Sequence, residues 1–225
     1  YGHLPYWVIT MKERLTNAFK GGNSDSIIFY SADIAHYIGD AHVPLHTSLY
    51  YDGQNTNMRG LHALWESTVP ELALSEYHLG SRHKANYLAR PEEAIWEAIQ
   101  HAHTLLPEMW QQEREATKDF TDATKYRMQT LYGREVKGYT TAFARAYNKR
   151  IAGMVNEQLL RTSNLIADFW YTAWVDAGKP NMEKISRNKR KAFKRERRAF
   201  KSNSLIEKNL LISKKKKVAD PSVTQ

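Results

Sequence analysis

The longest regular pattern in the sequence runs from about Gly138 to Ala177 and predicts a single long helix. Gly178 and Pro180 follow it directly, and these two residue types commonly end helices. Because its apolar side chains recur at helical spacing, we expect a core helix. The residues in this apolar stripe are Phe143, Tyr147, Ile151, Val155, Leu159, Leu165, Ile166, Phe169 and Trp170.

Helical spacing also dominates the rest of the first 182 residues, with almost no apolar and polar alternation of the kind that marks strands. The predicted fold class is therefore all-α, a multi-helix domain over residues 1–182. Further helices are expected over residues 5–19, from a cap at Asn23, Ser24 or Asp25 to about Ala41, over residues 61–74, and from Pro91 through about residue 112.

Two prolines interrupt these helical patterns. Pro44 should end the second helix, because proline lacks a backbone N–H and disfavours helical geometry in the preceding residue. His46 is therefore expected to begin a different segment. Pro70 should bend or end the helix over residues 61–74.

The positive charge of the chain is concentrated at one end. The formal net charge is +9, yet residues 183–225 carry 15 Lys/Arg and 4 Asp/Glu, a net charge of +11 that leaves −2 for residues 1–182. Much like charge with few apolar anchors predicts a solvated or disordered basic tail beyond a domain boundary near Glu183. Such a tail could adhere to an anionic partner, whereas bulk basicity says nothing about the function of the nearly neutral domain.

Cysteine is absent, which excludes disulfides, thiolate nucleophiles and cysteine zinc sites. No apolar run reaches the ~18 residues that a membrane helix needs, and residues 1–20 lack the basic-then-apolar order of a signal peptide. We therefore expect no transmembrane segment, and any bound metal must be held by nitrogen and oxygen atoms.

Two pairs of ligand-type side chains repeat a spacing of four residues: His36 with Asp40, and His62 with Glu66. Four helical steps of about 100° return to nearly the same face, so each pair can share one ion. His46, just past the proline break, can reach the same gap from a loop. Three histidines, one aspartate and one glutamate suit zinc, while the alternative is a set of exposed pairs or hydrogen-bonded core histidines.

The other histidines fit this pattern less well. His42 lies two residues past Asp40 and therefore points to another helix face, where solvent or an indirect supporting role is favoured over ligation. No converging partners are evident for His78, His83, His101 and His103, which are interpreted as surface residues.

The segments "HYIGDAHVPLH" and "YYDGQNTNMRGLHALWESTVPEL" resemble the zinc-dependent phospholipase C and S1/P1 nuclease superfamily, especially phospholipase C-like proteins of Bacteroidetes-type bacteria. The family order His-x-x-x-Asp, Pro-Leu-His, then His-x-x-x-Glu is present. "FWYTAWVDAGKP" is similar to the closing helix of the family, so the resemblance covers roughly residues 1–182. It implies a zinc-dependent hydrolase of phosphoester bonds, in which a metal-activated water attacks a phosphodiester of phospholipid or nucleic acid.

Carried over residue by residue, the resemblance implies that His46, His62 and Glu66 hold one zinc of a three-zinc cluster. His36 and Asp40 would serve the other two ions, with Asp40 as the bridging, catalytic carboxylate. The family's N-terminal tryptophan ligand, a nearby histidine, and a further Asp and His have no recognisable counterparts here.

These departures lead to two expectations. The chain is either an N-terminally incomplete piece of a longer secreted or periplasmic precursor, or a protein that has lost half of its cluster. In both cases we expect about one zinc per chain, and weak or undetectable hydrolysis by residues 1–225 alone. The alternatives are a catalytically incomplete zinc-binding module with a basic adhesion tail and, on the tail alone, a helical nucleic-acid-binding protein.

Overall fold

The computed structural model describes residues 2–54, 56–131 and 133–183, together with residues 194, 197, 198 and 202. The chain divides into two units, Tyr1–Pro180 and Asn181–Gln225. Most of the basic tail lies outside the described residues, so its disorder and the domain boundary near Glu183 stay predictions. None of the described helices is both long and apolar enough to span a membrane.

The first unit is built mainly from helices, which confirms the all-α class. Their bounds are α1 Leu4–Gly21, α2 Ser24–Ala41, α3 Leu61–Ala63, α4 Val69–Ala73, α5 Pro91–Thr104, α6 Leu106–Thr117, α7 Asp122–Lys125 and α8 Thr141–Asp176. Short 3₁₀ segments, η1 Pro44–Thr47 and η3 Leu74–Glu76, and a π-helical turn, η2 Leu64–Thr68, join some of them.

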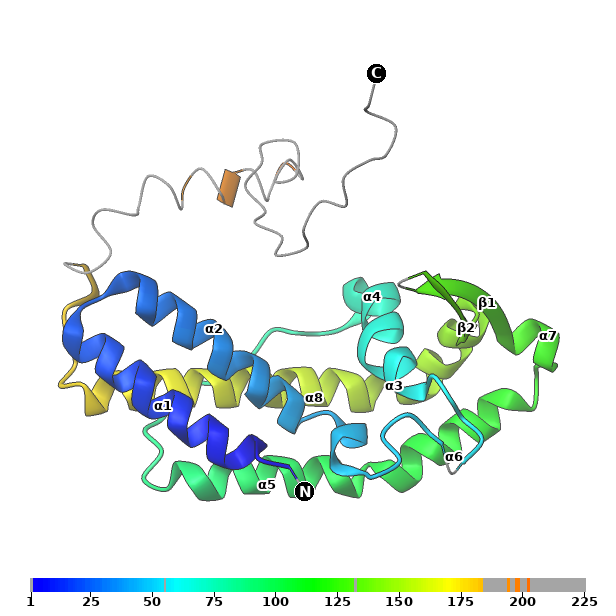
Figure 1. Cartoon of the computed structure of the whole chain (residues 1–225), viewed down its shortest axis with the longest axis horizontal. Coiled ribbons are helices and arrows are strands. Elements are labelled where there is room, and N and C mark those ends of the chain that lie inside the picture. The colour runs from blue at the N-terminus through cyan, green and yellow to red at the C-terminus, as the bar shows by residue number, and fades with distance from the viewer. Residues whose placement is uncertain are drawn as a thin grey trace. The chain divides into compact units, whose positions relative to one another are not determined.

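The long helix α8 is the element on which the others pack. In Figure 1, α1 and α2 lie over its C-terminal half and α4 over its N-terminal half, while α6 also contacts it. Its N-terminal half carries the core, where Phe143, Tyr147, Ile151 and Val155 are buried against residues of α3, η2, α4 and α6. The core-helix prediction is confirmed for these residues, but Trp170 is 40% exposed and its indole N–H donates to the carbonyl of Ser31.

Local signals explain where several helices start and stop. The Asn23 side chain accepts hydrogen bonds from the backbone N–H groups of Asp25 and Ser26 and so caps α2 as predicted. The expected continuation of α5 to residue 112 is wrong, because the chain turns at Leu105 before Pro107 starts α6.

The helical backbone continues through Pro70, but the α-helix predicted over residues 61–74 is divided into α3, η2 and α4. Pro70 cannot donate to the Glu66 carbonyl, and the chain adopts the wider π-helical turn η2 immediately before α4. Glu66, one of the candidate ligands, therefore lies in an unusual turn rather than in a regular α-helix.

The expectation of almost no strand structure missed one hairpin. Strands β1 Tyr126–Leu131 and β2 Arg134–Tyr139 pair antiparallel around a tight turn in which Gly133 has φ +76°. A buried ion pair holds the hairpin to the helices, with Lys125 Nζ 2.8 Å from Glu113 Oε1, and the Tyr139 hydroxyl donates to the same oxygen at 3.0 Å.

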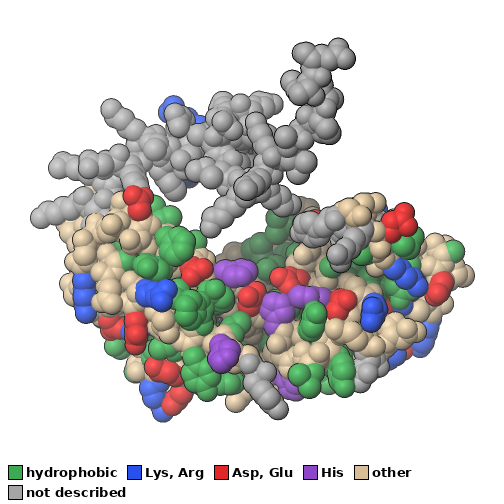
Figure 2. All heavy atoms as spheres, in the orientation of Figure 1, with side chains coloured by type: hydrophobic (Ala, Val, Ile, Leu, Met, Phe, Trp, Pro, Cys, Tyr) green, Lys and Arg blue, Asp and Glu red, His purple; other side chains and the backbone are tan. Residues whose placement is uncertain are grey.

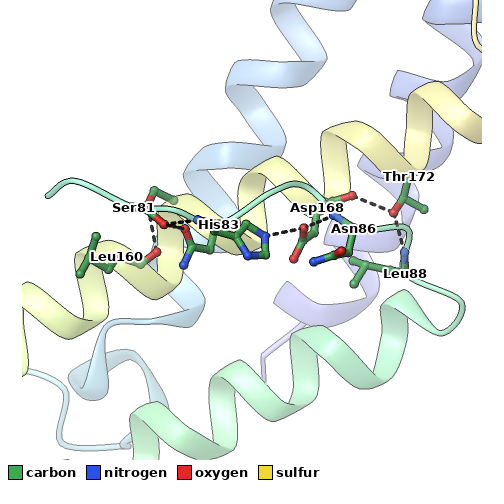
Figure 3. A network of polar contacts seen from close by, with 9 residues as sticks. Ser81, His83, Asn86, Leu88, Leu160, Asp168 and Thr172 are labelled. Atoms are coloured by element: carbon green, nitrogen blue, oxygen red, sulfur yellow. Dashed lines mark hydrogen bonds and ion pairs between the residues drawn. The ribbon is translucent and has the colours of Figure 1, made fainter.

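The segment between η3 and α5 is extended and is tied to α8 by side chains of that helix (Figure 3). Asp168 Oδ1 lies 2.7 Å from the His83 ring nitrogen Nε2 and accepts the Asn86 backbone N–H at 2.6 Å. The Thr172 hydroxyl accepts the Leu88 N–H at 2.9 Å. The prediction that His83 has no partner is therefore wrong. Spacing along the sequence did not indicate this contact, because His83 and Asp168 lie more than eighty residues apart.

The loop before α3 contains a glycine that we expect to be irreplaceable. Gly53 has φ +71°, and a Cβ there would lie 2.4 Å from the Met58 carbonyl oxygen. Gly53→Ala should destabilise the fold by at least about 2 kcal/mol, because left-handed geometry and a backbone clash add. Thermal unfolding should show a Tm at least about 4 °C lower.

The matched control for this change is Gly153→Ala in α8, where an added Cβ meets nothing within 4 Å. This substitution should stabilise the helix by about 0.5–1 kcal/mol. Equal Tm values for the two variants would contradict the steric account of Gly53.

Candidate metal centre

Side-chain atoms of His46 in η1, His62 in α3 and Glu66 in η2 lie close together. His62 Nε2 lies 2.6 Å from Glu66 Oε2 and 2.9 Å from His46 Nε2, and His46 Nε2 lies 3.5 Å from the same carboxylate oxygen. Within residues 2–54, 56–131 and 133–183, no other group of three His or acidic side chains comes as close together. On the face shown in Figure 2, histidine and acidic side chains gather near its middle.

The break at Pro44 sets the orientation of the His46 ring. The chain turns into η1, and His46 Nδ1 comes within 3.1 Å of the Asp40 backbone carbonyl, to which it can donate its proton. That tautomer leaves Nε2 with a free electron pair facing His62 and Glu66. The spacing of four in His62 and Glu66 supplies the other two atoms from one helical face.

His36 and Asp40 lie next to this group of three residues but are not part of it. Asp40 Oδ2 lies 3.6 Å from His36 Nε2, and Asp40 Oδ1 lies 3.7 Å from His46 Nδ1. Asp40 thus stands between the two rings, on the side of His46 away from Glu66. His36 is the most exposed of the five, with 70% of its side chain accessible.

The comparison with known families follows this geometry. The family model described as S1/P1 Nuclease matches residues 5–169. The chain belongs to the S1/P1 nuclease family. No curated protein and no solved structure matches the chain. Membership assigns this nuclease-family chain to the hydrolases of phosphodiester bonds, and it agrees with the resemblance found in the sequence.

The electrostatics of this nuclease-family site favour a positive charge between the three donors. Hydrogen bonds from His46 and His62 hold the pKa of Glu66 well below its usual range. The hydrogen bond to Glu66, reinforced by Asp40, raises the pKa of His46 despite partial burial. A proton is therefore retained where a metal ion could bind.

The dimensions also fit a metal ion. An ion with tetrahedral bonds of about 2.0–2.1 Å separates its ligand atoms by about 3.3 Å. The observed separation of 3.5 Å is near that value, and the other two, 2.6 and 2.9 Å, are the shorter distances of hydrogen bonds between the same three atoms. If these two imidazoles and one carboxylate held such an ion, they would leave a fourth position for water or a phosphate oxygen.

Two cavities flank Asp40 in the nuclease-family domain. The first, of about 270 Å³, is lined by His36, Asp40 and Glu66 together with apolar residues of η2 and α8. The second, of about 550 Å³, is lined by Asp40, His46 and one face of α5. A substrate can therefore approach the centre from two sides.

Among the other histidines, His78 and His103 are exposed as predicted, whereas His42 is buried rather than in solvent. His42 is 4% exposed, its Nδ1 lies 2.7 Å from the Ile38 carbonyl, and burial lowers its pKa. The buried Gln158 amide of α8 donates to the His42 carbonyl at 2.6 Å, so the loop carrying His46 rests on α8. His103 Nδ1 lies 3.0 Å from the Thr47 hydroxyl and His101 Nε2 lies 3.8 Å from Glu157, contacts that sequence spacing gave no sign of.

Proposed function

We propose that this chain is a zinc-dependent phosphodiester hydrolase whose His46, His62 and Glu66 hold a catalytic zinc ion. The observation that carries the proposal is that His46 Nε2, His62 Nε2 and Glu66 Oε2 all lie within 4.8 Å of one another, close enough to hold one metal ion. Bound zinc would lower the pKa of a water molecule and stabilise negative charge on phosphate oxygens.

Each residue has a distinct part in this proposal. His46 and His62 supply neutral nitrogen donors, and Glu66 supplies the carboxylate that balances the charge of the ion. Asp40 fixes the His46 ring through its carbonyl and, at the wall of both cavities, can accept a proton from the attacking water. With His36, Asp40 can also contribute to a further cation site.

The substrate we propose is nucleic acid, because the family is a nuclease family. A phospholipid headgroup offers the same phosphodiester chemistry. Family membership also supports export from the cytoplasm, with the basic tail as a region that adheres to anionic surfaces.

A second function is favoured by one specific observation. Only His46, His62 and Glu66 form a three-donor group within the part of the chain that the structure describes, and His36 with Asp40 add just two more groups. A module that binds zinc for stability without turnover would need no more than this.

Zinc-dependent hydrolysis of bis-p-nitrophenyl phosphate tests the proposal. Hydrolysis by residues 1–225 is expected to be slow at best; any turnover should disappear on chelation, return with zinc, and fall by about 100-fold in Asp40→Asn because the proton acceptor is lost. Asp119→Asn, which changes an exposed carboxylate outside the site, is the matched control. Tight zinc binding without any zinc-dependent hydrolysis would favour the module instead.

The pH dependence of zinc affinity should follow His46. Zinc must displace the proton that the raised pKa of His46 retains, so affinity should fall about tenfold per pH unit below that pKa and level off above it. Calorimetric titrations with zinc between about pH 5.5 and pH 8 would measure this. A flat profile across that range would show that His46 is not a ligand.

A further inference from the structure

A small cavity lies between α4, η3 and the N-terminal half of α8. It has a volume of about 80 Å³, against about 270 and 550 Å³ for the two cavities beside the metal centre, and it shares no lining residue with them. A cavity of this size admits a compact group rather than a nucleoside or an acyl chain. The lining residues are Leu72, Ala73, Glu76, Arg145, Asn148 and Lys149.

A buried amide with one unused polar group lines this cavity. Asn148 is 5% exposed, and its Oδ1 accepts the Tyr77 hydroxyl at 2.8 Å. Burial, reinforced by the charge of Glu76, raises the pKa of Tyr77 to about 12, so the hydroxyl keeps the proton that it donates. Asn148 Nδ2 has no hydrogen-bond partner within residues 2–54, 56–131 and 133–183, yet it stays accessible. Its two N–H donors are therefore available to a ligand in the cavity.

Two cations flank this amide on the same helix. Arg145 and Lys149 are four residues apart on α8, so both reach the side of the helix that lines the cavity. Both residues are exposed, and no carboxylate oxygen of the described chain lies within 4.0 Å of either cationic group. Glu76 is the one acidic residue of the described lining, so the lining carries a net charge of +1.

The surrounding segment is also basic. Residues 125–150 carry 7 Lys/Arg and one Asp/Glu, a net charge of +6, although residues 1–182 as a whole have a net charge of −2. This local excess of positive charge attracts anions to this end of α8 more strongly than to the rest of the domain. A cation would meet a positive lining, and an apolar group would leave the Asn148 donors unpaired.

We propose that this cavity binds a phosphate group, with Asn148 Nδ2 donating to one oxygen and with Arg145 and Lys149 contacting the others. A phosphate oxyanion offers acceptors, which match an amide N–H, a guanidinium and an ammonium. Inorganic phosphate and a phosphodiester of an oligonucleotide share this chemistry. None of the three residues belongs to the metal centre, so the inference does not depend on zinc-dependent hydrolysis.

Heteronuclear NMR of the full isotope-labelled chain tests the proposal, because the side-chain amide of Asn148 reports on this cavity. Inorganic phosphate should shift the amide resonances to saturation, with zinc bound or removed. Lys149→Gln should raise the apparent Kd about 3- to 10-fold, because one charged contact is lost. Glu76→Gln removes the opposing charge and should lower it. Lys118→Gln, which changes an exposed cation paired with Glu115 outside the cavity, is the matched control and should leave it unchanged.

The Asn148→Asp variant assigns the resonances, because it removes the amide while Tyr77 keeps an acceptor. A short oligothymidylate then separates the two sources of phosphate. A shift of the Asn148 resonances at lower concentration than inorganic phosphate requires would assign the site to a nucleic-acid backbone. A shift with inorganic phosphate alone would assign it to the free ion.

Two results would overturn the inference. The first is an Asn148 amide that responds to neither probe. The second is an equal apparent Kd in Lys149→Gln and the unaltered chain, which would place the effect outside the cavity. Absence of zinc-dependent hydrolysis would count against the proposed function and would leave both of these measurements as they are.

Discussion

Glu66→Gln is expected to weaken zinc binding by at least about 100-fold, since even residues that only support a metal ligand cost 10- to 100-fold when changed. The amide keeps the size of the side chain but removes the negative charge that faces His46 and His62. It also removes the largest cause of the raised His46 pKa, so the loss of zinc affinity in acid should begin at a lower pH in the variant. Competition titration with a zinc indicator measures the affinity.

His78→Ala is the control for this change, because His78 is exposed and its hydrogen bonds with Asn156 are made by its backbone. It should bind zinc as the unaltered chain does. If Glu66→Gln and His78→Ala bind zinc equally well, the three-residue site is not where the ion sits.

Lys125→Met is expected to destabilise the fold by about 3–5 kcal/mol, the usual cost of leaving a buried charge without its partner. The side chains of Lys125 and Glu113 are 7% and 2% exposed. The lysine ammonium also lies over the rings of Tyr126, Tyr139 and Phe143, so its loss removes favourable cation–π contacts. Urea unfolding monitored by circular dichroism gives the free energy.

The double variant Lys125→Met with Glu113→Gln separates the lost charge from the lost packing. The neutral amide introduced by Glu113→Gln can still accept from Tyr139, so much of the stability should return. Lys118→Met, which breaks an exposed pair with Glu115, should change stability by less than about 1 kcal/mol. A loss of that small size in Lys125→Met would contradict a structural role for the buried pair.

The fold was predictable wherever its signals are local. The Asn23 cap, the stop at Gly178 and the apolar stripe of α8 each depend on residues within a turn or two of one another. The hairpin was missed because its strands are held to the helices by contacts of Glu113 with Lys125 and Tyr139. The alternation of apolar and polar residues along a strand does not reveal such contacts. Trp170 was misplaced because spacing shows that residues share a helix face and not what covers that face.

In the candidate site, too, the local contacts were predictable and the long-range contacts were not. The pairs His36 with Asp40 and His62 with Glu66 are four residues apart, so their approach follows from helix geometry alone. The contact between His42 and Gln158 joins residues 116 apart, and the cavity wall on α5 depends on how that helix packs. Neither could be deduced from spacing.

Anomalous diffraction at the zinc absorption edge, from crystals of the zinc-loaded chain, tests the central claim most directly. We predict one strong peak about 2.0–2.1 Å from His46 Nε2, His62 Nε2 and a Glu66 oxygen. A peak bound elsewhere, for example at His83 and Asp168, with none between these three residues, would contradict the account.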